Sequence, residues 1–260
     1  MILAAGLGTR LKPLTDNTPK ALVEIDGTPI LGRLILNLKK QGFNYIVVNV
    51  HHFADKVKNF LSSTNFGVKI SVSDESHELL DTGGGIVHAK DLLFKYDDLP
   101  FIVHNVDILS NADLPDLLKT QDGLSLKTLG IVNRNDYKEG TTLLISDRSS
   151  SRKLIFDTAL NLKGWHDLQK NTFRPGDFIP SKDDRELAFS GIYAMSMGAV
   201  EEMETLMGNT GFSVMDYFLN AERRRPVSGF EQSGLKLIDI GKPATLLQAS
   251  QILKDLSAQF

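Results

Sequence analysis

The sequence contains no cysteine among its 260 residues. This absence excludes disulfides, thiolate metal sites and a cysteine nucleophile, and it is compatible with the reducing cytoplasm, where we expect the protein to work. No run of about 18 apolar residues occurs, so we expect no membrane-spanning segment. The chain opens in an apolar strand, Met1-Ile2-Leu3, rather than in the charged segment of a signal peptide. Because this strand is short, we expect a residue or two before Met1 in the natural protein.

The sequence also lacks an excess of basic residues, with 29 Lys and Arg against 32 Asp and Glu and a formal net charge of −3. A partner made of nucleic acid or a membrane surface normally requires a basic face, so neither is expected. There is no internal repeat, which argues against an appended hexapeptide-repeat acetyltransferase domain. Hydrophobic residues at 42% and charged residues at 23% are typical of a globular protein. We expect a monomer or a homodimer.

In the first half, short β-branched apolar runs alternate with stretches of helical periodicity. The runs predict strands over 1–5, 45–50, 68–73 and 101–104. The intervening stretches predict helices over 29–41, 53–62, 84–94 and 113–120. Such alternation favours an α/β fold with a mostly parallel sheet covered by helices on both faces. In these sheets the ligand site lies beyond the carboxyl ends of the strands.

After residue 122 the pattern changes to strands joined by polar loops. Strands are predicted over 124–133, 142–146, 153–157, 188–196 and 235–239, and helices over 215–224 and 243–258. Residues 166–186 are polar and rich in turn formers, and they are interpreted as an exposed loop. Without a linker or a low-complexity tract, the chain is predicted to form one domain over 1–260 with a small additional sheet.

A glycine-rich loop follows the first strand, in the segment LAAGLGTR. Small residues let backbone N–H groups approach a phosphate closely, which points to Ala4, Ala5, Gly6, Gly8 and Thr9 as nucleotide-binding residues. Arg10 adds a planar fork for phosphate oxygens and Lys20 a mobile charge. A dinucleotide fingerprint would need a third glycine where Leu11 stands, and the Gly-Lys-Ser/Thr of a Walker loop is absent.

The segments LAAGLGTRLKPLT and PKAL together resemble the signature of the sugar-1-phosphate nucleotidylyltransferases. The N-acetylmuramate-1-phosphate uridylyl and mannose-1-phosphate guanylyl types are the most similar in style. The resemblance implies a Rossmann-like three-layer fold, Mg²⁺ dependence, and transfer of a nucleotidyl group from a nucleoside triphosphate to a sugar 1-phosphate with release of pyrophosphate. It also implies a nucleotide-binding part over about 1–122 and a sugar-phosphate-binding part over about 123–240.

Asp107 and Asp239 are the predicted metal ligands. Each follows a strand, and Mg²⁺ sites of this kind combine one or two carboxylates with phosphate oxygens. The family resemblance places its two metal-binding aspartates at these positions, and Asn105 among the nucleotide-binding residues. For Asp239 a helix-capping role is the alternative. The family usually has Asn-Gly-Asp where this chain has Val106 in the middle, a side chain that we expect to reshape the floor of the sugar pocket.

Two further segments take their roles from the resemblance. In Asp81-Thr82-Gly83-Gly84-Gly85 it implies that Thr82 and Gly83 contact the nucleobase, and helix capping is a compatible alternative. Near Phe189-Ser190-Gly191 it implies that Glu186, Ser190 and Gly191 line the sugar pocket. From the residues alone, the second segment is a buried strand with a glycine prone to form a bulge.

In the expected reaction, Lys20 steadies the transferring phosphate and Arg10 the β- and γ-phosphates, while Mg²⁺ on the two aspartates bridges the substrates. A phosphocholine cytidylyltransferase is the alternative enzyme, and it would need an aromatic cage, for which Trp165 and Tyr193 are candidates. A non-catalytic nucleotide-sugar-binding subunit is the alternative outside enzymes. His51-His52 is interpreted as structural, because adjacent residues leaving a strand point to opposite sides.

Overall fold

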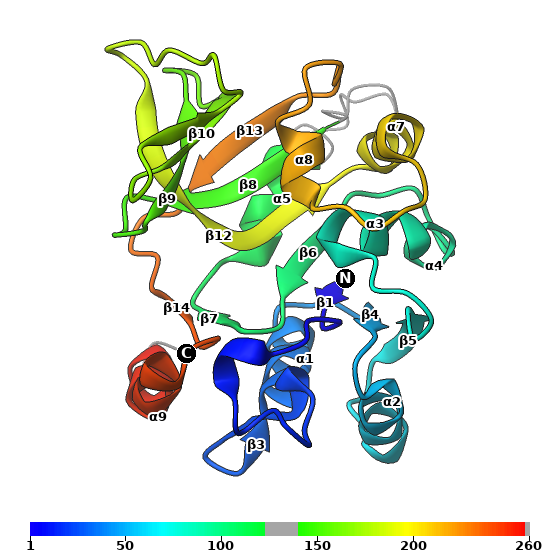
Figure 1. Ribbon diagram of the computed structural model, residues 1–260. Helices are drawn as coiled ribbons and strands as arrows, with labels where there is room; N and C mark the ends of the chain where they lie inside the picture. Colours follow the sequence, from blue (N-terminus) through cyan, green and yellow to red (C-terminus); the bar gives the residue numbers. More distant parts are fainter. Residues whose placement is uncertain (123–139, 258–260) are drawn as a thin grey trace.

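The computed structural model describes residues 1–122 and 140–257. Within these residues, ten strands form one sheet with the main order β11-β10-β9-β12-β6-β1-β4-β5 (Figure 1). Strand β8 also pairs with β12, and β13 pairs with β8. Its strands are β1 (Ile2–Leu3), β4 (Tyr45–Val50), β5 (Lys69–Asp74), β6 (Phe101–Asn105), β8 (Thr141–Ser146), β9 (Arg152–Phe156), β10 (Leu162–Asp167), β11 (Thr172–Arg174), β12 (Arg185–Met195) and β13 (Val227–Glu231). Two small sheets pair β2 (Glu24–Ile25) with β3 (Thr28–Pro29) and β7 (Ile108–Ser110) with β14 (Leu237–Asp239).

Helices cover both faces of this sheet, as predicted for a three-layer α/β protein. One hydrophobic cluster joins the sheet to α1 (Ile30–Lys40), α2 (Ala54–Ser63) and α5 (Leu114–Asp122). The other joins it to α3 (Asp81–His88), α7 (Met197–Met207) and α8 (Val214–Phe218). The remaining helices are α4 (Lys90–Leu93), α9 (Pro243–Ser257) and the short 3₁₀ turns η1 (Thr9–Leu11) and η2 (Lys20–Leu22).

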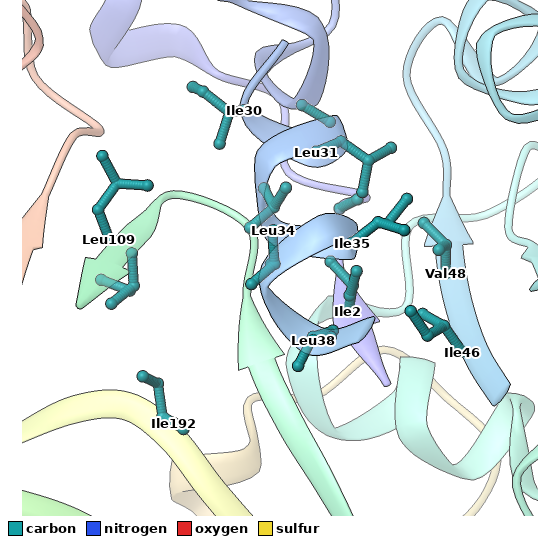
Figure 2. Close-up of a cluster of buried hydrophobic side chains, with 14 of the residues drawn as sticks. Ile2, Ile30, Leu31, Leu34, Ile35, Leu38, Ile46, Val48, Leu109 and Ile192 are labelled. Carbon is teal, nitrogen blue, oxygen red and sulfur yellow. The ribbon is translucent and has the colours of Figure 1, made fainter. Parts of the chain in front are cut away.

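The alternation of side chains along each strand creates the two clusters. Ile46 and Val48 of β4 belong to the cluster under α1, whereas Val47 between them faces the opposite layer. Figure 2 shows the first cluster, with the apolar face of α1 directed at β1 and β4. Ile35 of α1 is fully buried there. Every strand in the middle of the sheet is thus fixed from both sides.

The parallel and antiparallel parts of the sheet meet at β12. Strands β6, β1, β4 and β5 are parallel to one another, and β12 joins β6 in the antiparallel sense. The register between β12 and β8 shifts between Phe189 and Tyr193, where Gly191 has a φ of 75°. The bulge expected from this glycine is therefore present, and it lies beside the end of β6.

Several predicted elements need correction. The predicted helix over 84–94 begins earlier and is divided at Ala89 into α3 and α4. The loop predicted over 166–186 is wrong in part, because it contains the end of β10, all of β11 and the start of β12. These strands are polar because β11 is the edge of the sheet, with two of its three residues exposed. Helix α7 and strands β2, β3, β7, β10 and β13 were not predicted, and the strand predicted over 124–133 lies outside the described residues.

The predicted helix over 215–224 is also shorter than expected and ends at Phe218. Beyond it, the side chain of Arg223 donates from Nε to the Phe218 carbonyl at 3.2 Å. Arg223 is half-buried, so this residue closes the end of α8 instead of lying in solvent on a longer helix. A basic side chain at this position also complements the negative end of the helix dipole.

His104 gives the fold a testable dependence on pH. It is 2% exposed on β6, and burial lowers its pKa from 6.5 to about 4. Between these values the unfolded chain binds a proton that the folded protein does not, so acidification favours unfolding. We expect the free energy of unfolding to fall by up to about 3 kcal/mol from this group as the pH drops from 6.5 to 4.

Urea titrations across that pH range test this expectation with the variant His104→Asn, whose amide can replace the contact of Nδ1 with the Asn105 carbonyl. The variant should lose stability less steeply than the wild type on acidification. His77→Asn, at an exposed position, is the matched control and should keep the wild-type slope. Parallel slopes for the wild type and His104→Asn would contradict the assignment.

Candidate active site

A cavity of about 370 Å³ lies at the carboxyl ends of β1, β4 and β6. Five residues predicted to bind a nucleotide and the three predicted catalytic residues line it: Ala4, Ala5, Gly6, Thr82 and Asn105, with Arg10, Lys20 and Asp107. Val106 also lines this cavity while packing into the core beneath it. The other predicted site residues, which are Gly8, Thr9, Gly83, Glu186, Ser190, Gly191 and Asp239, do not line it.

The glycine-rich loop turns sharply as it leaves β1. A Cβ atom added to Gly6 would meet no atom within 4 Å, so the backbone faces open space beside the cavity. Gly8 has a φ of 67°, and a Cβ there would approach the Thr15 methyl group at 3.0 Å. The Thr15 hydroxyl also donates to the Gly8 carbonyl at 2.8 Å. Gly6 is thus compatible with close approach of a ligand, whereas Gly8 is required by the turn itself.

A buried polar network supports the start of this loop, and the sequence analysis missed it. The Asn49 side chain accepts a hydrogen bond from the Ala4 N–H at 2.6 Å and donates to Glu75 Oε1 at 2.8 Å. Asn49 and Glu75 are 2% and 3% exposed, and burial raises the pKa of the Glu75 carboxyl. A buried, partnered network of this kind fixes one geometry. The sequence signal was the asparagine inside the apolar run YIVVNV.

Asp107 and Asp239 are 132 positions apart in sequence, and β7 and β14 bring them together. These strands pair antiparallel, with Asp239 opposite Ile108. The Ile240 N–H continues the ladder by donating to the Asp107 carbonyl at 2.9 Å. Beyond the other end of the ladder, the Lys236 N–H donates to Asn111 Oδ1 at 2.7 Å. Backbone pairing therefore fixes the register that places the two aspartates side by side.

The two carboxylates and Arg10 converge above Gly241. A Cβ atom on Gly241 would lie 2.8 Å from Asp107 Oδ2, 2.8 Å from Asp239 Oδ1 and 2.9 Å from Arg10 Nη2. The Lys20 ammonium forms an ion pair with Asp107, and both side chains are largely buried. Two carboxylates converging beside a cavity lined by cationic side chains fit the donor set of Mg²⁺, which binds protein carboxylates together with phosphate oxygens.

Three consecutive glycines at the start of α3 allow other segments to approach this helix closely. A Cβ on Gly83 would lie 2.2 Å from the Phe212 ring, and one on Gly84 would lie 2.3 Å from the Thr210 carbonyl oxygen. The Gly83 N–H donates to the Phe212 carbonyl at 2.9 Å, so it is not directed into the cavity. Close packing against Phe212 thus requires a glycine at position 83, and the base contact expected of Gly83 stays a prediction. Thr82 still lines the cavity.

The three residues predicted to line the sugar pocket have different surroundings. A Cβ on Gly191 would lie 2.7 Å from Asn105 Nδ2, so the bulge of β12 contacts the wall of the cavity. Ser190 is 1% exposed, and its hydroxyl bonds the backbone of Ile192. Glu186 lies farther along β12, where it contacts His166 Nδ1 at 2.8 Å. Only Gly191 is thus tied directly to the cavity by these contacts.

The remaining candidates do not form a second site. His51 Nδ1 contacts the Glu75 carbonyl at 2.6 Å, while the His52 ring lies 4.0 Å from that of Phe53. Tyr193 is 1% exposed and packs against the rings of Phe189 and Phe218, so it cannot present a face to a ligand cage. Among the described residues there is no group of three or more histidines and acidic residues placed to hold a metal. No helix within residues 1–122 and 140–257 is long and apolar enough to span a membrane.

Comparison with known proteins agrees with this geometry. Residues 1–141 match the model of the family described as nucleotidyl transferase, which is more than half of the chain. The chain belongs to the nucleotidyl transferase family. The glycine-rich loop, Lys20 and Asp107 all lie within the matched segment of the chain, whereas Asp239 lies beyond it.

Two curated relatives narrow the comparison. The N-acetylmuramate α-1-phosphate uridylyltransferase of Caulobacter vibrioides is 44% identical over 110 residues, which are 41% of this chain and 44% of the relative. The mannose-1-phosphate guanylyltransferase catalytic subunit beta of Xenopus tropicalis is 26% identical over 208 residues, 78% of this chain and 51% of the relative. The chain therefore spans about half the length of these relatives.

A solved structure shares the fold over nearly the whole chain. HddC from Yersinia pseudotuberculosis, in complex with GMP-PN, has a TM-score of 0.69 and 24% identity, and the match covers 97% of each chain. The second half of the chain, which the family model does not reach, therefore shares this fold as well.

The packing role of Gly83 predicts a loss of stability on substitution. In Gly83→Ala the new methyl group overlaps the Phe212 ring, and overpacking of this kind costs about 1–3 kcal/mol. Urea unfolding of the purified variant should show a lower free energy of unfolding. Gly176→Ala is the matched control, because a Cβ at Gly176 meets nothing within 4 Å. Equal midpoints for both variants would mean that the Phe212 ring moves aside freely.

The convergence above Gly241 predicts a different result. Gly241→Ala places a methyl group between the two carboxylates and Arg10, so nucleotidyl transfer should fall by about 100-fold or more, a loss typical of a displaced group that stabilises charge. The rate is measured by pyrophosphate release, and urea unfolding tests whether the fold persists. Gly176→Ala should retain wild-type activity. A fully active Gly241→Ala enzyme would rule out a role for this cluster.

Proposed function

We propose that this protein transfers a nucleotidyl group from a nucleoside triphosphate to a sugar 1-phosphate, releasing pyrophosphate. The convergence of Asp107, Asp239 and Arg10 above Gly241 is the observation that carries the proposal. It lies where the carboxyl ends of the parallel strands meet, beside the cavity lined by the glycine-rich loop. A cluster with both carboxylates and cations suits a reaction in which phosphate charge must be held and moved.

The proposed step is an in-line displacement at the α-phosphorus. An oxygen of the sugar 1-phosphate forms a bond to this phosphorus, and the bond to the oxygen bridging the α- and β-phosphates breaks. That oxygen leaves with both electrons as part of pyrophosphate. The attacking phosphate is already ionised near neutral pH, so no general base is required. Positioning and charge neutralisation therefore supply the catalysis.

The roles of the side chains follow from their places around the cavity. Lys20, held beside Asp107, would contact the transferring phosphate. Arg10, which is exposed at the mouth of the loop, would hold the β- and γ-phosphates through its planar fork. The open backbone at Gly6 accommodates close approach of the triphosphate, while Thr82 and Asn105 line the cavity where the nucleoside would lie.

Asp107 and Asp239 would hold Mg²⁺ in the proposed enzyme. The ion, when bound, would neutralise phosphate charge and orient the two substrates. In this proposal the nucleotide occupies the part of the chain over about 1–122 and the sugar phosphate the part over about 123–240. We favour the uridylyl and guanylyl types of transfer, because the two relatives are named as a uridylyltransferase and a guanylyltransferase. We propose that the protein works in the cytoplasm.

The alternatives have weaker support. A phosphocholine cytidylyltransferase would need an aromatic cage, and Tyr193 is buried among other rings instead of facing a cavity. A non-catalytic nucleotide-sugar-binding subunit would have no need of both carboxylates together with Arg10 and Lys20. All four groups lie around the same point here.

Pyrophosphate release with Mg²⁺, the common nucleoside triphosphates, a panel of sugar 1-phosphates and phosphocholine tests the proposal. At least one triphosphate should react with a sugar 1-phosphate, and phosphocholine should not react. Asp107→Asn and Asp239→Asn should each lower kcat/KM by about 100-fold or more, because each removes a charged ligand worth several kcal/mol.

Asp98→Asn, an exposed aspartate in the segment before β6, is the matched control and should remain fully active. Absence of release with every pair would sink the enzymatic proposal. Full activity of Asp107→Asn would show that the metal assignment is wrong even if the reaction is right.

A further inference from the structure

Arg148 is a cationic residue that the proposed mechanism does not yet use. It lies in the connection between β8 and β9, and its Nη2 donates to the Phe189 carbonyl at 2.8 Å. The guanidinium is half-buried, and among the described residues its Nε is a buried donor with no hydrogen-bond partner. A buried hydrogen-bond donor that is left unpaired costs free energy, so an acceptor supplied by a ligand would stabilise this side chain.

Three observations place the Arg148 guanidinium near the candidate active site. Phe189, which accepts its hydrogen bond, is two residues before Gly191, and Gly191 lies against Asn105 in the cavity wall. The negative charge of Asp239 acts on the Arg148 guanidinium and opposes the lowering of its pKa by burial. Arg148 does not line the nucleotide cavity itself. It therefore lies outside the cavity lining, close enough to Asp239 for the two charges to interact.

The neighbouring residues hold this connection in place. Lys153 is 8% exposed, and its ammonium group donates to the Arg148 carbonyl at 2.9 Å. Lys153 also approaches the exposed carboxylate of Asp147 at 3.6 Å. Lys153 thus pairs with Asp147, and its hydrogen bond to the Arg148 carbonyl holds the backbone at Arg148 in place.

We propose that Arg148 binds the phosphate of the acceptor substrate, a sugar 1-phosphate, across the two aspartates from the triphosphate. The inference rests on the proposed function, in which two phosphate-bearing substrates meet at Asp107 and Asp239. Arg10 and Lys20 belong to the glycine-rich side of the site, so the acceptor phosphate needs a cation of its own. A planar guanidinium suits phosphate oxygens, and one nitrogen already bonded to Phe189 fixes its orientation.

A purely structural role is the competing explanation, in which Arg148 only ties the β8–β9 connection to the bulge of β12. The two explanations differ in which substrate is affected by substitution. Loss of a phosphate contact raises the KM for the sugar 1-phosphate alone, whereas a distorted bulge alters Asn105 and with it the binding of the triphosphate as well.

Steady-state kinetics of Arg148→Gln and Arg148→Lys distinguish them. A charged hydrogen bond to phosphate is worth about 1.5–3 kcal/mol, so Arg148→Gln should raise the KM for the sugar 1-phosphate by about 10- to 100-fold. The KM for the triphosphate should stay within about twofold of the wild-type value, and Arg148→Lys, which keeps the charge, should give an intermediate KM. Arg152→Gln removes a neighbouring arginine whose side chain is 68% exposed, and it should match the wild type. Urea unfolding confirms that each variant is folded.

Calorimetric binding separates this inference from the reaction itself. N-acetylmuramate α-1-phosphate and α-mannose 1-phosphate are titrated into the wild type and Arg148→Gln, with and without a triphosphate that cannot be cleaved between its α- and β-phosphates. If the wild type binds a sugar 1-phosphate and Arg148→Gln binds it at least 10-fold more weakly, Arg148 has the proposed role even if no pyrophosphate is released. The inference is overturned if the wild type binds neither sugar phosphate, if substitution leaves binding unchanged, or if it weakens both substrates equally.

Discussion

The backbone ladder between β7 and β14 is the constraint on which the candidate site depends. Asp107 precedes β7, and Asp239 ends β14, so the antiparallel register of three residue pairs decides whether their carboxylates meet. The Ile240 N–H and the Asp107 carbonyl extend this register to the point where Gly241 leaves room between the two side chains. Main-chain pairing positions both residues, and further contacts hold their side chains. Lys20 pairs with the Asp107 carboxylate, and the Gly241 N–H donates to Asp239 Oδ1 at 2.7 Å.

The parts of the site around this ladder are supported in different ways. The glycine-rich loop is held by Asn49 and Glu75, which are buried below the Ala4 amide. The bulge of β12 brings Gly191 against Asn105, so the antiparallel half of the sheet contacts the cavity formed by the parallel half. Because β12 pairs with β6 along four residues, this contact is part of the sheet itself. The candidate site thus combines elements from both halves of the chain on one continuous scaffold.

The sequence predicted those features whose signal is local. The strands ending at Val50 and Asn105 are short apolar runs that the sequence predicted. The cavity does lie at the carboxyl ends of the parallel strands, as expected for such a sheet. The α/β fold and the family resemblance are confirmed by the structure and by the comparisons. The predicted bounds of helices were less accurate where tertiary contacts decide them. One helix was predicted over 84–94 from its periodicity, whereas the structure has two helices separated at Ala89.

The sequence could not reveal features set by distant partners. Gly83 shows why, since a glycine needed for contact with a ligand and one needed beside the Phe212 ring are identical in sequence. The strands of the β10–β11 edge are polar, so they have the composition of a loop. Arg148 belongs to no motif, and only its hydrogen bond to Phe189 and its half-buried position distinguish it from other surface arginines.

The place of β14 in the chain also has a consequence for biosynthesis. A ribosome delivers the glycine-rich loop, Lys20 and Asp107 early, together with the strands that form the parallel half of the sheet. The second carboxylate arrives only with residue 239, after the chain has crossed the sheet to β13. A nascent or truncated chain that stops before β14 contains every residue lining the cavity at the ends of β1, β4 and β6 but lacks the pair of aspartates above Gly241. The pair of aspartates can therefore form only after β14 has been synthesised, whereas every residue lining the cavity is present once residue 107 has been added.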